Sequence, residues 1–160
     1  MPHDDCTPPP GGDGTGGTAL SIRLGPSADE VRGALAELRR KWQALQLSDD
    51  MARRAELVLA EALNNVVEHV QRDTPDGVIE LDMRISAGGM IFRIRDDGVA
   101  MPAERLPKGR LPDMGTQTDA LPEGGFGWFL IHAMSDGLKY CRRPAGNCLC
   151  IHILDRLAAG

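Results

Sequence analysis

The sequence predicts a two-layer α/β sandwich, an α+β fold in which a mostly antiparallel, mixed sheet carries helices on one face. Two observations carry this prediction. Every predicted strand alternates apolar with polar or charged residues, so each strand has one face for a core and one for solvent. Other segments place apolar residues at helical spacing, and the apolar face of a sheet can cover their stripes. A chain of 160 residues is long enough to bury one such core.

Composition limits the classes of partner. The net charge of −5 argues against broad electrostatic attraction to nucleic acid or to an anionic membrane. No apolar run reaches the length of a membrane span, and the N-terminus lacks the basic and apolar regions of a signal peptide, so we expect a cytoplasmic protein. Residues 1–18 are rich in Pro and Gly, which predicts a flexible tail before a single domain at 19–157.

The first half of the domain contains a predicted strand and two predicted helices. Residues 20–24 alternate as a half-buried strand does. Ser27 and Glu30 form a capping box that starts a helix, with a predicted buried stripe of Val31, Leu35, Leu38, Trp42 and Leu45. Ser48 caps a second helix, which runs to about Val70, with a predicted buried stripe of Ala55, Val58 or Leu59, Ala62, Val66 and Val70.

The second half switches to period two. Residues 79–85 and 90–95 form a predicted hairpin around Gly88-Gly89. A long loop at 98–124, rich in Pro and Gly, precedes a third helix from Gly127 to about Ser135. Two final strands follow, at 138–143 and 148–154. A loop of this length in a compact domain is more often functional than not.

Three polar clusters lie beside this scaffold, and the first is in the stretch EALNNVVEHV. Glu61, Asn65 and His69 are spaced at i, i+4 and i+8, which places them on one stripe of the second helix. A carboxylate and an amide oxygen one turn apart suit a general base and a ligand for Mg²⁺. A solvated helix face is the alternative. Asn64 is turned by about 100° from Asn65, which leaves it at most a secondary role in positioning Glu61 or a water.

The second and third clusters flank the long loop. The second cluster is Asp96-Asp97-Gly98, at the end of a strand. One of its carboxylates can accept a hydrogen bond from a ligand amino group, and the glycine permits close approach of the ligand. A plain turn is the alternative. In the third, Glu-Gly-Gly-Phe-Gly at 123–127 opens a helix, whose unpaired N–H groups suit phosphate. A flexible connection is the alternative there.

The order of these clusters is more specific than any one of them. A helix with E-x-x-x-N-x-x-x-H, a strand ending in D-x-G, a long loop and G-x-G opening a helix together resemble the Bergerat-fold (GHKL) ATPases. Within them the chain is most similar to the bacterial anti-sigma-factor serine/threonine kinases. The resemblance extends from Thr18 to about Leu154.

The resemblance implies a role for each matching residue and implies ATP and Mg²⁺ as cofactors. Glu61 matches the catalytic carboxylate, Asn65 the asparagine that holds Mg²⁺, and Asp96, with Gly98 beside it, the aspartate that recognises the adenine amino group. His69 matches a site position of open role. An ATP lid falls at about 99–124, and the glycine loop that meets the phosphates matches Gly124, Gly125, Phe126 and Gly127. Ala100 departs from the Gly or Pro common there.

The resemblance also implies an activity and partners. The expected function is a serine/threonine protein kinase that acts as a switch, sequestering a sigma factor and phosphorylating an anti-anti-sigma (STAS-type) protein. Two alternatives remain: a module that senses ATP without transferring phosphate, and the ATP-binding domain of a histidine kinase. Family members are often dimers, so a homodimer is possible.

Two further groups allow two interpretations each. Arg105, Lys108 and Arg110 can reach a γ-phosphate or simply be solvated. The second group lies on the last two strands and consists of Cys141, Cys148, Cys150 and His152. These side chains can bind a metal such as zinc. Alternatively, they are small residues on the outer face of the sheet or part of a dimer surface.

Overall fold

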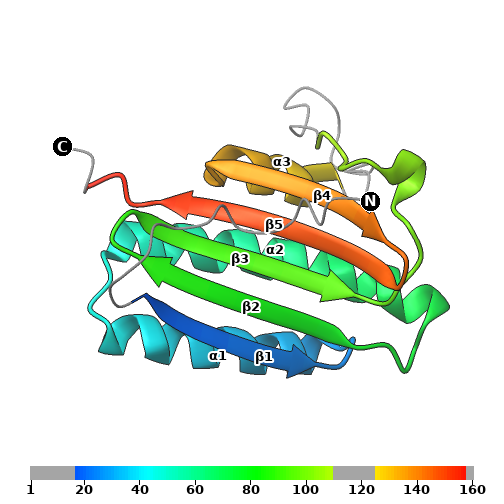
Figure 1. Cartoon of the computed structure of the whole chain (residues 1–160), viewed down its shortest axis with the longest axis horizontal. Helices are drawn as coiled ribbons and strands as arrows, with labels where there is room; N and C mark the ends of the chain where they lie inside the picture. Colours follow the sequence, from blue (N-terminus) through cyan, green and yellow to red (C-terminus); the bar gives the residue numbers. More distant parts are fainter. Residues whose placement is uncertain (1–16, 110–124, 158–160) are drawn as a thin grey trace, which may run out of the picture.

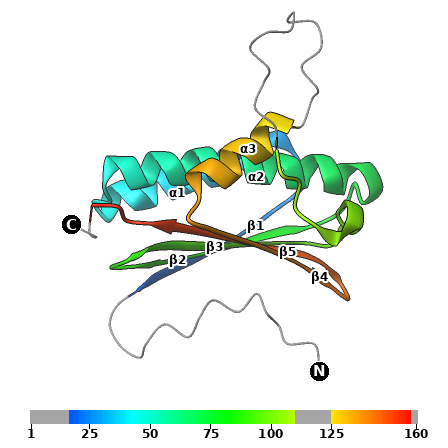
Figure 2. The same cartoon turned by 90° about the horizontal axis from the view of Figure 1, so that it is seen from above.

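The computed structural model describes residues 17–109 and 125–157, which form a sheet with helices on one of its faces (Figures 1 and 2). The five strands lie in the order β1-β2-β3-β5-β4, and every pairing between them is antiparallel. Their bounds are β1 Thr18–Leu24, β2 Ile79–Ser86, β3 Gly89–Asp96, β4 Gly137–Arg143 and β5 Gly146–Leu154. The predicted two-layer arrangement is confirmed.

The sheet is not mixed within the described residues. Two helices separate β1 from β2, and they run out and back, so the chain re-enters the sheet at the end where it left. Leu24, the last residue of β1, therefore pairs with Ile79, the first of β2. The pairs β2–β3 and β4–β5 are hairpins, which are antiparallel by construction.

The helices are α1 (Ala28–Ala44), α2 (Asp49–Asp73) and α3 (Gly125–Met134), with a short 3₁₀ turn, η1, at Pro102–Glu104. Both predicted N-caps are present. The hydroxyl of Ser27 accepts a hydrogen bond from the N–H of Glu30 at 3.2 Å, and that of Ser48 accepts one from Met51 at 3.3 Å. No helix of the described residues combines the length and apolar character that a membrane crossing needs.

The core lies between the helices and the inner face of the sheet. All predicted stripe positions of α2 are buried, including both Val58 and Leu59. Trp42 of α1 meets Phe92 of β3 edge-on, with ring centroids 6.3 Å apart. The prediction for Leu45 was wrong: it is 38% exposed, because α1 ends one residue earlier and Leu45 is its C-cap.

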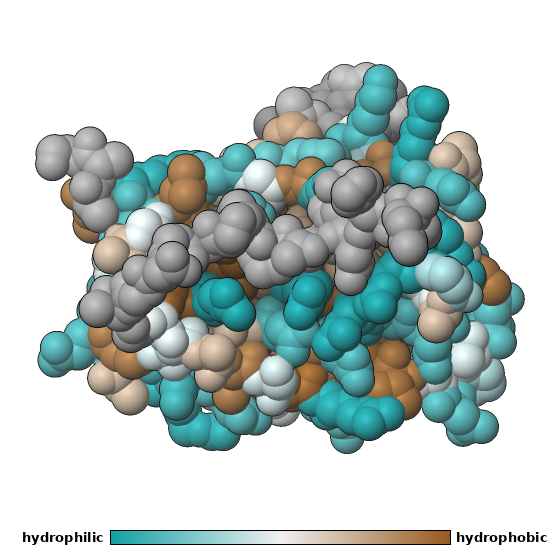
Figure 3. Space-filling model, in the orientation of Figure 1, coloured by the Kyte–Doolittle hydropathy of each residue, from teal (hydrophilic) through white to brown (hydrophobic). Residues whose placement is uncertain are grey.

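The outer face of the sheet is polar, as the alternation predicts, and Figure 3 shows hydrophilic residues gathered over β2 and β3. Asp82 of β2 accepts from Arg93 and Arg95 of β3 at 3.3 and 2.9 Å. Arg95 also pairs with Glu80 at 3.1 Å. Burial works against ionisation of Asp82, but the bond from Ser21 and the two arginines outweigh it, and the pKa of Asp82 is lowered.

One charged side chain is buried on the helix side. Arg54 of α2 is only 6% exposed, and its guanidinium reaches three groups from distant parts of the chain. It donates to Asp50 at 3.0 Å, to Asp136 at 3.2 Å and to the carbonyl of Leu154 at 2.6 Å. Arg54 therefore joins α2 to the turn after α3 and to the end of β5.

Candidate nucleotide site

The predicted acid–amide stripe of α2 lies against the first turn of α3. A Cβ placed on Gly127 would be 2.7 Å from Oε2 of Glu61 and 3.7 Å from Nδ2 of Asn65. A side chain at position 127 would therefore displace the Glu61 carboxylate from its present place. Glycine at this position lets the backbone of α3 approach both polar side chains, and the structure brings these three residues together.

Asn65 has an incomplete set of hydrogen bonds. Its Nδ2 atom is buried and has no partner among the described residues. Because the oxygen and nitrogen of an amide are assigned from their surroundings, turning the amide would place Oδ1 at the same position. In either orientation Asn65 keeps a polar atom available for a ligand. Asn64, the neighbouring asparagine, is exposed and makes no side-chain hydrogen bond in the described part of the chain.

The N-terminus of α3 completes this end of the site. The helix begins at Gly125, two residues before the predicted start, so Gly125, Phe126 and Gly127 all lie in its first turn. The first N–H groups of a helix have no intrahelical acceptor and carry the positive end of the helix dipole, which suits phosphate. Phe126 is 48% exposed and stacks on Phe129 at 6.2 Å. Gly124 lies outside the described residues.

At the other end of the stripe, the structure separates the two aspartates of the Asp-Asp-Gly motif. Oδ1 of Asp96 accepts hydrogen bonds from the N–H of Gly98 at 2.8 Å and from Nδ2 of Asn147 at 2.9 Å. Its Oδ2 accepts none from the described residues. Asp97 instead accepts from the N–H of Val78 at 3.1 Å and thereby holds the start of β2. In both aspartates Oδ2 accepts nothing from the described residues, but Asp97 is exposed, whereas Asp96 is partly buried beside Gly98 and near His69 of the α2 stripe. Asp96 is thus the aspartate that belongs to the site.

Burial dominates the electrostatics of Asp96. It disfavours the charged carboxylate and raises the pKa of Asp96, and the nearby charge of Asp97 acts in the same direction. The bonds from Asn147 and Gly98, together with the charge of His69, oppose this shift without cancelling it.

His69 lies beside Gly98 and holds the segment that follows β3. Its Nε2 donates to the carbonyl of Val99 at 2.6 Å, and its Cδ2 is 3.7 Å from a Cβ placed on Gly98. The polar stripe of α2 therefore lies beside the first turn of α3 at Glu61 and beside the end of β3 at His69. These positions are eight residues apart, about 12 Å along a helix, which suits an elongated ligand with different chemistry at its two ends.

Three polar residues at this end were not assigned a role from the sequence: Asn147, Tyr140 and Arg142. Asn147 is 3% exposed and lies opposite Asp96 in the β3–β5 pairing. Tyr140 and Arg142 of β4 both donate to its Oδ1, at 2.6 and 3.2 Å. The only signal in the sequence was an amide residue directly after the turn glycine Gly146, where a strand begins.

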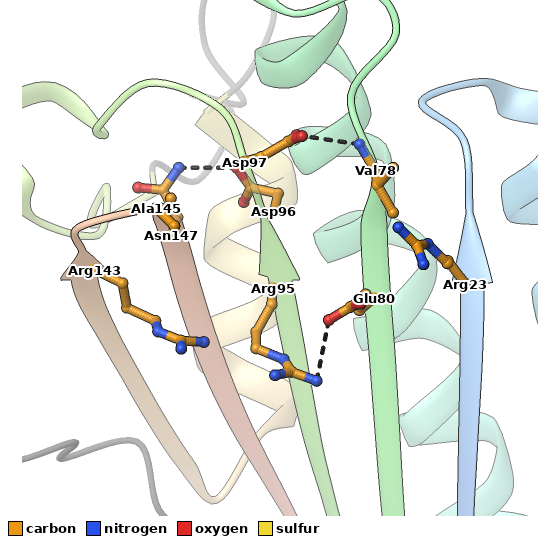
Figure 4. Close-up of a pocket in the computed structure, with 10 residues that line it drawn as sticks. Arg23, Val78, Glu80, Arg95, Asp96, Asp97, Arg143, Ala145 and Asn147 are labelled. Carbon is orange, nitrogen blue, oxygen red and sulfur yellow. Dashed lines mark hydrogen bonds and ion pairs between the residues drawn. The ribbon is translucent and has the colours of Figure 1, made fainter.

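A cavity of about 310 Å³ opens on the outer face of the same strand ends (Figure 4). None of its lining residues belongs to α2 or α3, so it is separate from the Glu61–Asn65 end of the site. Its side chains are of mixed charge, and the ion pair between Arg95 and Glu80 crosses it. The lining comprises Arg23, Val78, Glu80, Arg95, Asp96, Asp97, Arg143, Ala145, Gly146 and Asn147.

The structure gives less support to the other candidates from the sequence, which are the cysteine cluster, the basic residues and the predicted lid. Among the described residues, no group of three His, Cys, Asp or Glu side chains is placed to hold a metal ion, so the zinc interpretation of the β4–β5 cysteines finds no support. Arg105 and Lys108 are exposed, and Arg110 lies outside the described residues. Of the predicted lid, residues 99–109 are described: η1 contacts β4, and the carbonyl of Pro107 accepts from His132 of α3 at 2.8 Å.

Comparisons with known proteins identify the family of the chain. The family described as the histidine kinase-like ATPase domain matches residues 25–153. Serine-protein kinase RsbW of Oceanobacillus iheyensis is 31% identical over 84 residues, 52% of this chain and 53% of that protein. RsbW of Listeria monocytogenes is 29% identical over 84 residues, 52% of this chain and 54% of that protein. The match thus spans about half the length of these curated relatives.

Among solved structures, the mycobacterial sensor histidine kinase MprB is similar over 86% of this chain and 97% of its own. The identity is 14% and the TM-score 0.46, too distant a likeness to support an argument about function.

Proposed function

Because the chain belongs to the histidine kinase-like ATPase domain family, we propose that it is an ATP- and Mg²⁺-dependent serine/threonine protein kinase. The observation that carries the proposal is the contact of Glu61 and Asn65 with the first turn of α3. That contact brings a carboxylate and an amide to the first backbone N–H groups of α3, which have no intrahelical acceptor. The similarity to serine-protein kinases supports the proposal over the matched half of the chain.

In the proposed mechanism, each end of the site has its own task. Oδ2 of Asp96 accepts a hydrogen bond from the adenine amino group, which fixes the base. The N–H groups at the start of α3 bind phosphate oxygens and stabilise the charge that develops on them. Glu61 accepts the proton of the attacking hydroxyl. Positioning and electrostatics supply most of the acceleration, because phosphoryl transfer requires little covalent help from the protein.

The donor set near Gly127 fits Mg²⁺. This ion takes oxygen ligands, keeps several waters and binds through few protein groups when it is shared with phosphates. The amide of Asn65 has a buried atom without a protein partner and lies beside the Glu61 carboxylate, at the end of the site where phosphates are proposed. When bound, Mg²⁺ neutralises phosphate charge, and Asn65 would hold it.

The proposed acceptor is a serine or threonine of a partner protein. By the family resemblance, that partner is an anti-anti-sigma (STAS-type) protein, and a sigma factor is the protein that this chain sequesters. A cytoplasmic location and a homodimer are part of the same proposal. Incubation with γ-labelled ATP, Mg²⁺ and a candidate partner tests it: label on a partner serine or threonine supports the kinase. Tight ATP binding without transfer would instead favour an ATP-sensing module, and label on histidine a histidine kinase.

Substituting Asn65 by alanine is expected to weaken Mg-ATP binding by about tenfold or more, the worth of one lost interaction with a charged group. Asn64→Ala is the matched control, because the same amide is removed one residue away on the exposed side of α2. Titration of each variant with ATP, with and without Mg²⁺, makes the comparison. An Asn65→Ala variant with wild-type affinity for Mg-ATP would show that the assignment of the metal ligand is wrong.

Substituting Asp96 by asparagine is expected to separate stability from binding. The raised pKa of Asp96 means that its contribution to stability is present below pH 3.8 and is lost as pH rises through the folded-state value. Asparagine carries no charge at neutral pH and keeps an oxygen for Gly98 and Asn147. The variant should therefore be at least as stable as the wild type at pH 7.

The same variant turns an amide NH₂ toward the adenine amino group, so ADP affinity should fall about 10- to 100-fold. Asp97→Asn is the control, because Asp97 accepts from the N–H of Val78 and has no proposed role in binding adenine. Urea denaturation and ADP titration measure the two effects. Equal losses of ADP affinity in both variants would argue against Asp96 as the base-recognising residue.

A further inference from the structure

The amide of Asn147 is fully hydrogen-bonded inside the protein. Its Nδ2 donates to Oδ1 of Asp96 at 2.9 Å and to the carbonyl of Val99 at 2.8 Å. Its Oδ1 accepts from the hydroxyl of Tyr140 and from Arg142. An amide has two donor hydrogens and two acceptor positions, and all four are used here. The donors around Oδ1 fix the orientation of the amide, so its NH₂ group must face Asp96.

This orientation has a consequence for the Asp96 carboxylate. Asn147 and the N–H of Gly98 both donate to Oδ1, and no described residue donates to Oδ2. The carboxylate therefore cannot rotate without losing two hydrogen bonds to a group whose burial makes them valuable. Gly146 allows the start of β5 to approach the end of β3 closely. Its φ is +148°, and a Cβ at this position would overlap the carbonyl oxygen of Asp96.

The same cluster holds the segment that leads from β3 into the predicted lid. Arg142 donates to the carbonyl of Gly98 at 2.7 Å, and Asn147 to that of Val99. The hydroxyl of Tyr140 accepts from the N–H of Met101 at 3.2 Å. One hydrogen-bond network around the buried Asn147 therefore includes the carboxylate proposed to recognise adenine and three of the four residues that follow Asp97.

We propose that Asn147, oriented by Tyr140 and Arg142, is a positioning residue that aims Oδ2 of Asp96 at the adenine amino group and links adenine recognition to the placement of residues 98–101. The inference rests on the proposed nucleotide site and adds to it the residues that make the site selective for adenine. Tyr140 is the link to the lid segment, because its hydroxyl contacts both Asn147 and Met101.

A pair of nucleotides separates positioning from a merely structural role. ADP has an amino group at purine position 6, whereas inosine diphosphate has a carbonyl oxygen there, which cannot donate to Asp96. If Asn147 aims Asp96, then Asn147→Leu should lower ADP affinity about tenfold or more and change inosine diphosphate affinity much less. The ratio of the two affinities therefore falls. A substitution that only loosens the fold would weaken both nucleotides together and leave the ratio unchanged.

Two further variants keep the test decisive if Asn147→Leu does not fold. Tyr140→Phe removes one hydroxyl and keeps the ring; it should lower the ADP to inosine diphosphate ratio by a smaller factor and speed hydrogen exchange at the Met101 amide. Arg143→Ala is the control on the same hairpin, because Arg143 lines the outer cavity and its side chain makes no hydrogen bond to the described residues. It should leave the ratio at the wild-type value.

The outcomes distinguish the two proposals. A wild-type protein that binds neither nucleotide overturns the proposed nucleotide site, and one that binds both equally overturns adenine recognition by Asp96. The positioning role of Asn147 fails in both cases. A wild type that prefers ADP, together with Asn147→Leu and Tyr140→Phe variants that keep the full preference, overturns the positioning role alone. A reduced preference in both variants, with Arg143→Ala unchanged, supports it.

Discussion

Replacing Glu61 by glutamine should lower the rate of phosphoryl transfer about 100- to 10,000-fold, the usual contribution of a general base. Glutamine has nearly the same shape and keeps the contact with Gly127, but it cannot accept the proton of the attacking hydroxyl. ATP affinity should change little, because the phosphates are held by α3 and the base by Asp96. Single-turnover transfer from γ-labelled ATP to the partner protein, measured beside an ATP titration, gives both quantities.

Glu68→Gln provides the control for this experiment. Glu68 is on the same helix and loses the same charge, but it is exposed and lies off the Glu61–Asn65–His69 stripe. Its transfer rate should equal that of the wild type. If Glu61→Gln transfers phosphate at the wild-type rate, Glu61 is not the base, and the proposed mechanism fails even where ATP binding persists.

Replacing Arg54 by alanine should lower the free energy of unfolding by about 2–3 kcal/mol, the worth of its hydrogen bonds to charged groups and of its buried stem. The guanidinium bonds Asp50, Asp136 and the Leu154 carbonyl from a side chain only 6% exposed. Its loss leaves the Leu154 carbonyl without this donor and removes the link between α2 and the end of β5. Urea denaturation monitored by tryptophan fluorescence and by circular dichroism measures the change.

Arg53→Ala is the matched control, because it removes the same side chain from an exposed position one residue away. Its effect should be within about 0.5 kcal/mol of zero, as for most surface substitutions. Equal stability of Arg53→Ala and Arg54→Ala would show that the buried network contributes nothing net.

Much of the fold follows from the sequence because local signals and burial agree there. Ser27 and Ser48 cap helices whose stripes are buried, and the alternation in β2 and β3 separates a core face from a charged face. The predicted burial of Leu45 was wrong because the helical spacing of apolar residues continues past the residue where α1 ends. The spacing alone does not show where a chain must turn toward the next helix.

Some features of the candidate site also follow from local sequence, and others depend on residues far away in the chain. Spacing along one helix places Glu61, Asn65 and His69 on a common stripe, and that is visible in the sequence. Which of Asp96 and Asp97 is held by Asn147 and which by Val78 depends on groups far away in the chain, and no local pattern contains this information. The role of Asn147 is of the same kind, since its four hydrogen bonds come from residues on β3, on β4 and in the segment after β3.

The helix α2 fixes the distance between the two ends of the proposed site. One uninterrupted helix fixes both the separation and the relative direction of the phosphate end and the base end. Inserting or deleting one residue between Glu61 and His69 would shift one end by about 1.5 Å and rotate it by about 100° relative to the other. Asn65 or His69 would then face away from its present neighbours. The chain can therefore change by substitution along this stretch but not by length.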